Sequence, residues 1–461
     1  MGDLELYEAL FIIGLLLLPY DALHVLPSTY RPIAIVPLAL SLLLCAVDNG
    51  FRSIRKNQML LLLFFGYVVV SSAAITLAIK GDSSSFLDVV ISLGMGVVLF
   101  FSFSSVLRVK YDTLDLKGML DWLFIWLSRA YTVPILVGLL EALSLIGLLP
   151  SFVNSGLVSF FGGNQSSRLT LTSYEASWAS YHLLLAAISY CYVYQLRRGA
   201  FSAIAFVLSS LLFLYTQSMQ GFLILAVAAV LYVVWYSKQK GNLLTLLKWV
   251  LTIAAVALVV FLVLTFIYSS QDASSYYARR LLGFVDVEHL VRTDGSSFVR
   301  LVFPVIGMQM FIDNPLFGVG GGSFASALPQ YILDYYPWSL TFGEIQKDIA
   351  GILVPSAVSV YTRVFAEGGF LGALFFYGFL SSVLKGLGAL GKGEGRLFIA
   401  AFAAIAMICT VLQFASYAFA PFWLAMGLLD SVVPSAFARG SFHSKCVPKA
   451  AEMGSPSTLI N

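Results

Sequence analysis

Two short polar stretches in an otherwise apolar chain combine an arginine with a carboxylate. Arg168 precedes Glu175 by seven residues in the stretch SRLTLTSYEASW, and Arg363 precedes Glu367 by four residues. The planar guanidinium group of arginine suits bidentate binding of a phosphate or a carboxylate. A carboxylate within hydrogen-bond reach of a hydroxyl group can act as its general base. These residue types therefore indicate anion binding next to a group that can accept a proton.

Both stretches also have a structural explanation. Thr172 and Glu175 match the capping box that precedes many helices. Arg363 and Glu367 share one helix face, so they can simply pair with each other. For Glu175 and for the Arg363–Glu367 pair, a functional role and a purely structural role are both open. For Arg168 a functional role is favoured, because Glu175 is its only obvious partner nearby in the sequence.

A third stretch carries the most specific pattern in the chain. Arg300 is followed by a mostly apolar run to Ile312, and this run contains Pro304. The pattern predicts a short bent helix on or in the membrane surface, ended by the pair that begins at Asn314. The segment then continues as NPLFGVGGGSF.

The glycines of this segment, which include Gly318 and Gly320, supply backbone N–H groups that can approach an anion closely. No Walker lysine follows them, so the segment is not a nucleotide-binding P-loop. A tight turn that re-enters the membrane is the alternative explanation.

Further arginines and aromatic residues accompany these stretches. The arginines Arg279, Arg280 and Arg292 suit phosphate or carboxylate binding, or they cover the membrane surface and pair with lipid phosphates. Trp338 offers a ring face on which a sugar can stack, although aromatic belts at membrane interfaces are the commoner reason for such residues. Tyr361, which accompanies Arg363 and Glu367 at the start of the tenth predicted span, is a further candidate substrate contact.

The composition predicts the elements that must position these residues. Of the 461 residues, 59% are hydrophobic and 11% are charged, whereas soluble domains average about 25% charged residues. This shortfall extends over the whole length and is typical of an all-α polytopic membrane protein. The four cysteines and four histidines show no metal-ligand spacing, so we predict no metal site and no cofactor. A removable signal peptide is not expected.

About twelve transmembrane helices and one long extracytoplasmic loop with short helices are expected. Most of the 27 lysines and arginines fall on one side of the apolar segments, which predicts that both termini are cytoplasmic. We divide the chain into a bundle of nine spans (1–268), the long loop (269–355), spans ten to twelve (356–433) and a disordered cytoplasmic tail (434–461). The apolar segments are 5–20, 33–48, 58–78, 86–107, 131–149, 178–195, 200–217, 219–236, 246–268, 358–384, 397–414 and 416–433.

Taken in order, the three polar stretches resemble a known family. They read Arg-x₆-Glu-x-Ser-Trp, then an arginine followed by Asn-Pro-Leu-Phe-Gly-Val-Gly-x-Gly-x-Phe, then Tyr-x-Arg-x₃-Glu-Gly. This order resembles the O-antigen polymerase and O-antigen ligase superfamily of bacterial inner membranes. The resemblance covers about residues 60–430 but is specific only at these three places. It implies a periplasmic loop that closes over a lipid-linked glycan, arginines that hold undecaprenyl diphosphate, and catalysis without a metal.

Departures from the family pattern favour a polymerase. Ligases carry a His-Asn pair shortly before the glutamate of the third stretch, and this chain has PSAVS there, at 355–359. Many members have Ser-Arg-Gly where this chain has SMQG, at 218–221, so one familiar arginine is missing. The stretch SYEASW resembles the Glu-Pro-Ser motif of Wzy-type polymerases, with Ala176 in place of the proline.

The resemblance implies that a glycan passes from undecaprenyl diphosphate to a sugar hydroxyl of a new lipid-linked unit, at the periplasmic face of the inner membrane. The product would be O-antigen, capsule or exopolysaccharide. Arg168 and Arg300 would neutralise the leaving diphosphate, with Glu175 as the first choice of base and Glu367 as the second. Expected partners are this lipid-linked glycan, membrane lipids and a chain-length regulator, with no nucleic acid. The alternatives are an O-antigen ligase, with an acceptor such as lipid A core, and a lipid-linked glycan transporter.

Overall fold

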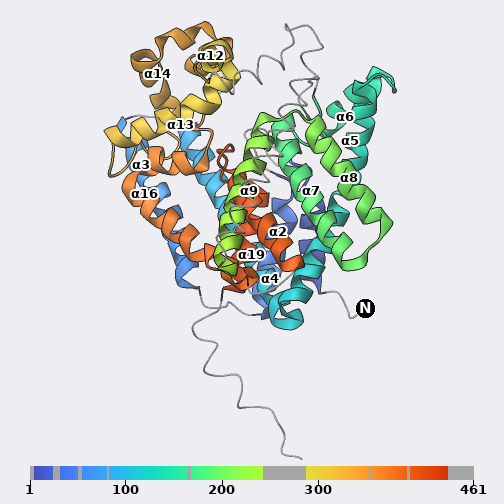
Figure 1. Cartoon of the computed structure of the whole chain (residues 1–461). Coiled ribbons are helices and arrows are strands. Elements are labelled where there is room, and N and C mark those ends of the chain that lie inside the picture. Colours follow the sequence, from blue (N-terminus) through green and yellow to red (C-terminus); the bar gives the residue numbers. More distant parts are fainter. Residues whose placement is uncertain are drawn as a thin grey trace, which may run out of the picture.

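The computed structural model describes residues 5–23, 32–49, 54–79, 83–163, 168–241, 287–351, 355–391 and 395–433, and all the regular elements in them are helices (Figure 1). The predicted all-α polytopic membrane fold is confirmed. Five of these helices are long and apolar enough to cross a membrane. The total of about twelve spans stays a prediction, and the expected ninth span and the C-terminal tail lie outside the described residues.

Most of the helices form one bundle. Its centre is α19, whose residues are all buried and which packs against the long helix α4 and against α16 and α18. Large apolar side chains on the outer helices, such as Val70 and Ile204, are exposed, as lipid contact requires. The helices of the bundle are α1 (Leu6–Leu17), α2 (Ile35–Asn49), α3 (Lys56–Ile79), α4 (Ser83–Ala130), α5 (Thr132–Leu145), α6 (Ser151–Phe161), α7 (Ala176–Arg197), α8 (Ala200–Tyr215), α9 (Met219–Lys240), α16 (Val360–Leu384), α17 (Leu387–Gly391), α18 (Arg396–Thr410) and α19 (Ala420–Val432).

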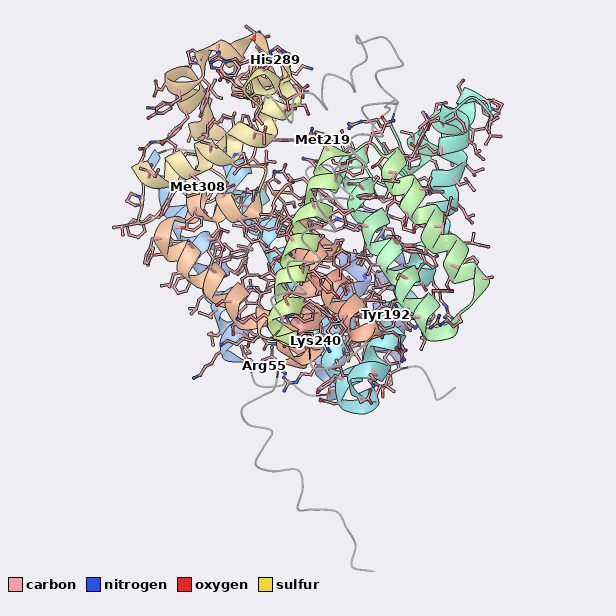
Figure 2. All side chains as sticks on the ribbon, in the orientation of Figure 1. Arg55, Tyr192, Met219, Lys240, His289 and Met308 are labelled. Carbon is pink, nitrogen blue, oxygen red and sulfur yellow. The ribbon has the colours of Figure 1, made fainter. Side chains whose placement is uncertain are left out.

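The second part is a small helical lobe, residues 287–351, which belongs to the predicted long loop. It has a core of its own, built around Phe298, Phe303 and Phe324. Figure 2 shows His289 on the lobe. Arg55 and Lys240 lie at the opposite end of the molecule, at the end of the bundle. The helices of the lobe are α12 (Val287–Thr293), α13 (Gly295–Asp313), α14 (Phe324–Tyr335), the 3₁₀ helix η1 (Pro337–Thr341) and α15 (Gly343–Ile349).

Helix α4 continues through residues 108–130, which were predicted to connect the apolar segments 86–107 and 131–149. The chain stays helical and reverses at Asp115, which has a φ of 66°. The Asp115 carboxylate accepts the N–H of Gly118 at 2.8 Å and so caps the returning helix. Lys110 lies 5.4 Å from the ring of Trp122, as expected for a helical hairpin. The returning arm leads into α5, so helical structure begins well before residue 131, where the predicted fifth span starts.

Helix α16 is likewise two arms and not the single predicted span 358–384. Gly369 has a φ of 60° inside it, a left-handed conformation that glycine adopts without strain. The Tyr377 hydroxyl donates to the Tyr361 carbonyl at 3.0 Å across 16 residues, which a straight helix would separate by about 24 Å. The first arm, 360–368, therefore folds back against the second, 370–384.

Candidate functional site

A cavity of about 400 Å³ lies where the lobe meets the bundle, between helices that are far apart in the sequence. It is lined by five charged side chains, by the amides of two glutamines and by aromatic and small residues. Four residues proposed from the sequence, Glu175, Arg300, Arg363 and Glu367, all contribute to its wall. The lining residues are Asp88, Val89, Ser92, Glu175, Trp178, Gln220, Val299, Arg300, Gly322, Pro355, Ser356, Val358, Arg363, Glu367, Gln413, Phe414, Ala415 and Ser416.

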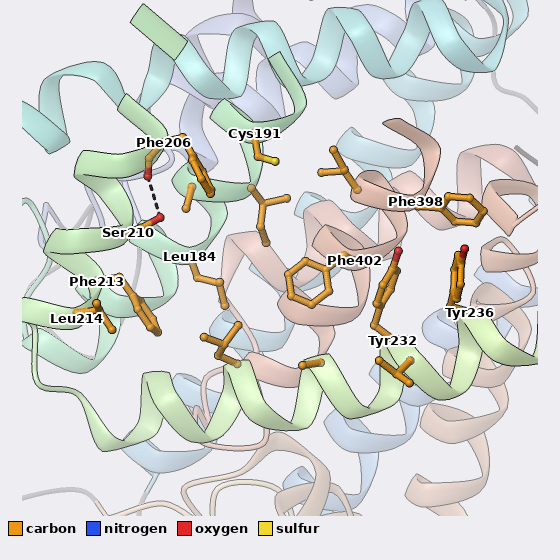
Figure 3. Close-up of a pocket in the computed structure, with 16 residues that line it drawn as sticks. Leu184, Cys191, Phe206, Ser210, Phe213, Leu214, Tyr232, Tyr236, Phe398 and Phe402 are labelled. Carbon is orange, nitrogen blue, oxygen red and sulfur yellow. Dashed lines mark hydrogen bonds between the residues drawn. The ribbon is translucent and has the colours of Figure 1, made fainter. Parts of the chain in front are cut away.

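A second, larger cavity of about 720 Å³ lies between α7, α8, α9 and α18 (Figure 3). Its wall is apolar and aromatic, with Leu184, Phe213 and Phe402 among its residues, and the lining includes no charged side chain. It can accommodate apolar groups, but its lining includes no carboxylate, histidine, lysine or arginine for acid–base chemistry or anion binding. The smaller cavity is therefore the candidate site.

Arg363 is the most firmly held charge in this site. Its Nε donates to Glu367 Oε2 at 3.0 Å, and its Nη1 donates to the carbonyl of Ala415 at 2.9 Å. The guanidinium group also lies 4.9 Å from the centre of the Tyr417 ring. These bonds use two of its five N–H donors. Arg363 and Glu367 thus pair as a structural explanation requires, and they line the cavity as well.

The glycine-rich turn holds this pair in place. Val319 N–H donates to the carbonyl of Ala366 at 2.8 Å, and Gly320 N–H donates to the carbonyl of Glu367 at 3.1 Å. In the other direction, Phe370 N–H donates to the carbonyl of Pro315 at 2.7 Å. The turn is therefore bonded, backbone to backbone, to the break of α16.

Only glycine permits so close an approach. Gly318 has a φ of +68°, and a Cβ atom on it would lie 2.5 Å from the Ala366 carbonyl oxygen. A Cβ atom on Gly369 would lie 2.5 Å from the Gly318 nitrogen. The main chains of the two segments are in direct contact at this point.

This geometry contradicts the expected anion-binding role of Gly318 and Gly320. The Gly318 N–H already donates to the Asn314 carbonyl, and the Gly320 N–H to α16. Asn314, also proposed as a substrate contact, ends α13 and donates its side-chain N–H to Met310 O at 3.4 Å. The motif positions the site and does not contribute these amides to a ligand.

Glu175 stands directly before α7 as its N-cap residue. Its carboxylate accepts the Ser177 hydroxyl at 2.6 Å and makes no capping bond to the helix backbone. The predicted capping box is absent, because the Thr172 hydroxyl instead donates to the carbonyl of Pro19 at 2.6 Å. The structural explanation for Glu175 is therefore wrong. Its carboxylate lines the cavity at the positive end of the α7 dipole.

The segment before Glu175 is held by Glu141, a buried carboxylate of α5 that sequence reasoning missed. It accepts the Thr170 N–H at 2.9 Å and the Leu171 N–H at 2.7 Å. Leu171 has a φ of 55°, which is unfavourable for a leucine and needs such support. Arg168 lies at the start of this segment, half-buried, and is not among the residues that line the cavity.

Two other kinds of residue in the wall also went unnoticed in the sequence. Asp88 is a single carboxylate near the start of the apolar run of α4, and ionisable residues at the edge of a span are a recognisable functional signal. Gln413 carries no charge and was not singled out, and Gln220 was noted only as part of the stretch SMQG that lacks the family arginine.

The remaining predicted contacts lie elsewhere. The Tyr361 hydroxyl donates to the carbonyl of Ile408 at 2.9 Å, inside the bundle. Arg292 pairs with Glu288 at 3.1 Å and lies 5.2 Å from the Trp338 ring, on the lobe. None of these three predicted residues lines the cavity, and Arg279 and Arg280 lie outside the described residues. Within the part of the chain that the structure describes, no group of three or more His, Cys, Asp or Glu residues could hold a metal ion.

Comparison with known proteins gives one match. Residues 204–377 match the O-antigen ligase family (Wzy_C). The matched range contains Gln220, Arg300, Arg363 and Glu367, which are four of the polar residues of the cavity. No match is found among the curated proteins. The family match confirms the predicted relationship to the O-antigen polymerase and ligase superfamily.

Proposed function

We propose that this membrane protein, with its O-antigen ligase family domain, is a glycosyltransferase that polymerises undecaprenyl-diphosphate-linked repeat units into O-antigen, capsule or exopolysaccharide. The lobe would then face the periplasm, on the outer side of the inner membrane. One observation carries the proposal: a single cavity between lobe and bundle combines two arginines with three carboxylates. A transfer from a lipid diphosphate to a sugar hydroxyl needs both kinds of group.

In the proposed reaction, a hydroxyl oxygen of the acceptor sugar attacks the anomeric carbon of the donor glycan. A new C–O bond forms, the bond from that carbon to the diphosphate oxygen breaks, and undecaprenyl diphosphate leaves with the electron pair. Arg300 and Arg363 are placed to neutralise the charge that develops on the diphosphate. Arg168 remains a proposed contributor, in second place because it is not among the residues that line the cavity.

The hydroxyl proton passes to a carboxylate. Glu367 is already engaged in an ion pair, because its Oε2 lies 3.0 Å from Arg363 Nε. Glu175 accepts only the hydroxyl of Ser177 among the bonds that we find for it, so it is the better base. Asp88 is the third carboxylate of the cavity and could replace either of them.

An O-antigen ligase is the second candidate, because that is the description of the matching family. A ligase would move finished glycan to a different acceptor, such as lipid A core. The region in which ligases are expected to carry a His-Asn pair lines the cavity here through Pro355, Ser356 and Val358. Because no histidine is among the described residues that line the cavity, we favour the polymerase.

The proposal is tested by Arg300→Ala in cells, with polysaccharide resolved on a gel and protein measured by immunoblot. We expect normal protein, no long polymer, and single repeat units still attached to their final acceptor. The control is Arg292→Ala, because Arg292 lies on the lobe away from the cavity, and it should leave polymer intact. Normal chain lengths in Arg300→Ala would contradict the proposal. Loss of the attached single units as well would identify a ligase.

A further inference from the structure

We propose that Trp178, Gln220, Gln413 and Phe414 form a subsite for an uncharged sugar ring of the acceptor. These four residues, here called the amide–aromatic corner, come from α7, from α9 and from the segment between α18 and α19. The inference rests on the proposed function, since it assigns one of the two substrates of that reaction to one part of the cavity wall.

The aromatic half of the corner is rigid. The rings of Trp178 and Phe414 lie 5.1 Å apart at 72°, an edge-to-face contact. Phe414 also lies 4.5 Å from Phe419, which fixes it from the other side. A sugar ring has apolar C–H faces that pack well against such a surface. Binding pockets commonly combine aromatic walls of this kind with a few well-placed polar groups.

Gln220 provides the strongest indication of a ligand. Its side chain is 9% exposed, and we find no hydrogen bond from it to any residue in the described part of the chain. The residue lines the cavity, where an amide without a protein partner can bind a ligand or water. An amide offers both donors and acceptors, so it can bind two neighbouring hydroxyl groups of a sugar.

The position of Gln220 is fixed by its helix. The Ser218 hydroxyl accepts the Gly221 N–H at 3.1 Å and caps the start of α9. Gly221 packs directly on α7, where a Cβ atom would lie 2.5 Å from the Ser180 hydroxyl oxygen. Gln220 therefore has a rigid backbone at the cavity wall, as a recognition residue requires.

The corner suits an uncharged ring and not a second phosphate. Its amides and aromatic rings carry no net charge, whereas the arginines of the cavity come from α13 and α16. Glu175 precedes Trp178 by three residues, so the preferred base stands beside the corner. An acceptor sugar held there would present its hydroxyl to Glu175, and the donor diphosphate would remain with Arg300 and Arg363.

The experiment uses the full-length protein in lipid vesicles. The probe is the lipid-linked repeat unit extracted from host cells that lack this protein, with inorganic pyrophosphate as inhibitor. For Gln220→Met we expect the half-saturating concentration of the unit to rise about tenfold. The maximal rate and the inhibition by pyrophosphate should stay unchanged. Gln239→Met, at the far exposed end of the same helix, is the matched control and should change nothing.

Trp178→Leu provides a second variant in case Gln220→Met does not fold, and it should shift half-saturation in the same direction. Unchanged half-saturation in either folded variant overturns the subsite. A parallel loss of pyrophosphate inhibition overturns it as well, because that would indicate general damage to the cavity. If the unmodified protein forms no polymer at all, the proposed function fails. A polymerising protein that is indifferent to Gln220→Met rejects the subsite alone.

Discussion

Replacing Gly318 with alanine perturbs the site without changing the chemical identity of any side chain that lines the cavity. The new Cβ atom would lie 2.5 Å from the Ala366 carbonyl oxygen and 2.6 Å from the Glu367 carbonyl carbon. Carbon contacts are comfortable only at about 3.5 Å or more, so the two backbones must separate by roughly 1 Å. Because these are main-chain atoms, no side chain can rotate to relieve the clash.

The cost follows from what the separation breaks. The hydrogen bonds from Val319 to Ala366 and from Gly320 to Glu367 are each worth about 1 kcal/mol. Backbone strain adds about 1 kcal/mol more, because an alanine is unfavourable at a φ of +68°. Docking of the turn on α16 is therefore weakened by about 3 kcal/mol, more than a hundredfold in the docking equilibrium. We expect polymer formation to fall more than tenfold, because Glu367 loses its backbone support.

Two measurements check this prediction. Polymer length on a gel, at equal protein level, reports the activity, and hydrogen exchange of the amides at 318–320 and 370–371 reports the docking. Gly343→Ala is the matched control in the same lobe, since a Cβ atom there meets nothing within 4 Å. If Gly318→Ala keeps both the chain length and the exchange protection of the unmodified protein, the close contact between the turn and α16 is not needed for activity.

Three further predictions follow from single contacts. Arg363→Lys should abolish long polymer, because one ammonium group cannot replace both the bond to Glu367 and the bond to a backbone carbonyl; a gel that shows normal polymer would contradict this. Glu141→Gln should speed hydrogen exchange at Leu171 by more than tenfold, because one carboxylate oxygen that accepts a backbone N–H becomes an amide nitrogen; exchange as slow as in the unmodified protein would exclude that role. Burial, with a smaller contribution from a neighbouring carboxylate, raises the pKa of Asp348 in the lobe to about 6. The folded lobe therefore binds a proton that the unfolded lobe has lost, and its stability falls as the pH rises from about 4 to about 6. Asp348→Asn should remove this fall and raise exchange protection of the lobe at neutral pH by about 1–2 kcal/mol, whereas an unchanged pH profile would show that Asp348 does not cause it.

Four residues that the sequence singled out as candidates, Glu175, Arg300, Arg363 and Glu367, line one cavity. Charged residues are scarce in an apolar chain, and those at the ends of spans stand out because burying them in lipid is costly. Their three motifs lie far apart in the chain, yet the structure places all four side chains on one cavity.

The path of the chain could not be predicted in the same way. Hydropathy measures the length of an apolar run but not its direction, so the reversals at Asp115 and Gly369 were invisible. The role of Gly318 was mistaken for a similar reason. A glycine that approaches an anion and a glycine that lies against another backbone look alike until the second backbone is known.

Single polar residues inside apolar runs were the other omission. Glu141 and Asp88 each stand alone among apolar neighbours, and Gln220 has no charge that would attract attention. Their partners come from distant segments, for example Thr170 and Leu171 for Glu141, so only the folded chain shows what they do.

We propose that this one chain is sufficient to join lipid-linked repeat units. The most direct test is reconstitution of the purified protein in lipid vesicles with purified undecaprenyl-diphosphate-linked repeat unit and no other protein. We expect a ladder of polymer together with free undecaprenyl diphosphate, and neither product with Arg300→Ala. Absence of polymer from the unmodified protein, or transfer of glycan only when a different acceptor such as lipid A core is supplied, would contradict it.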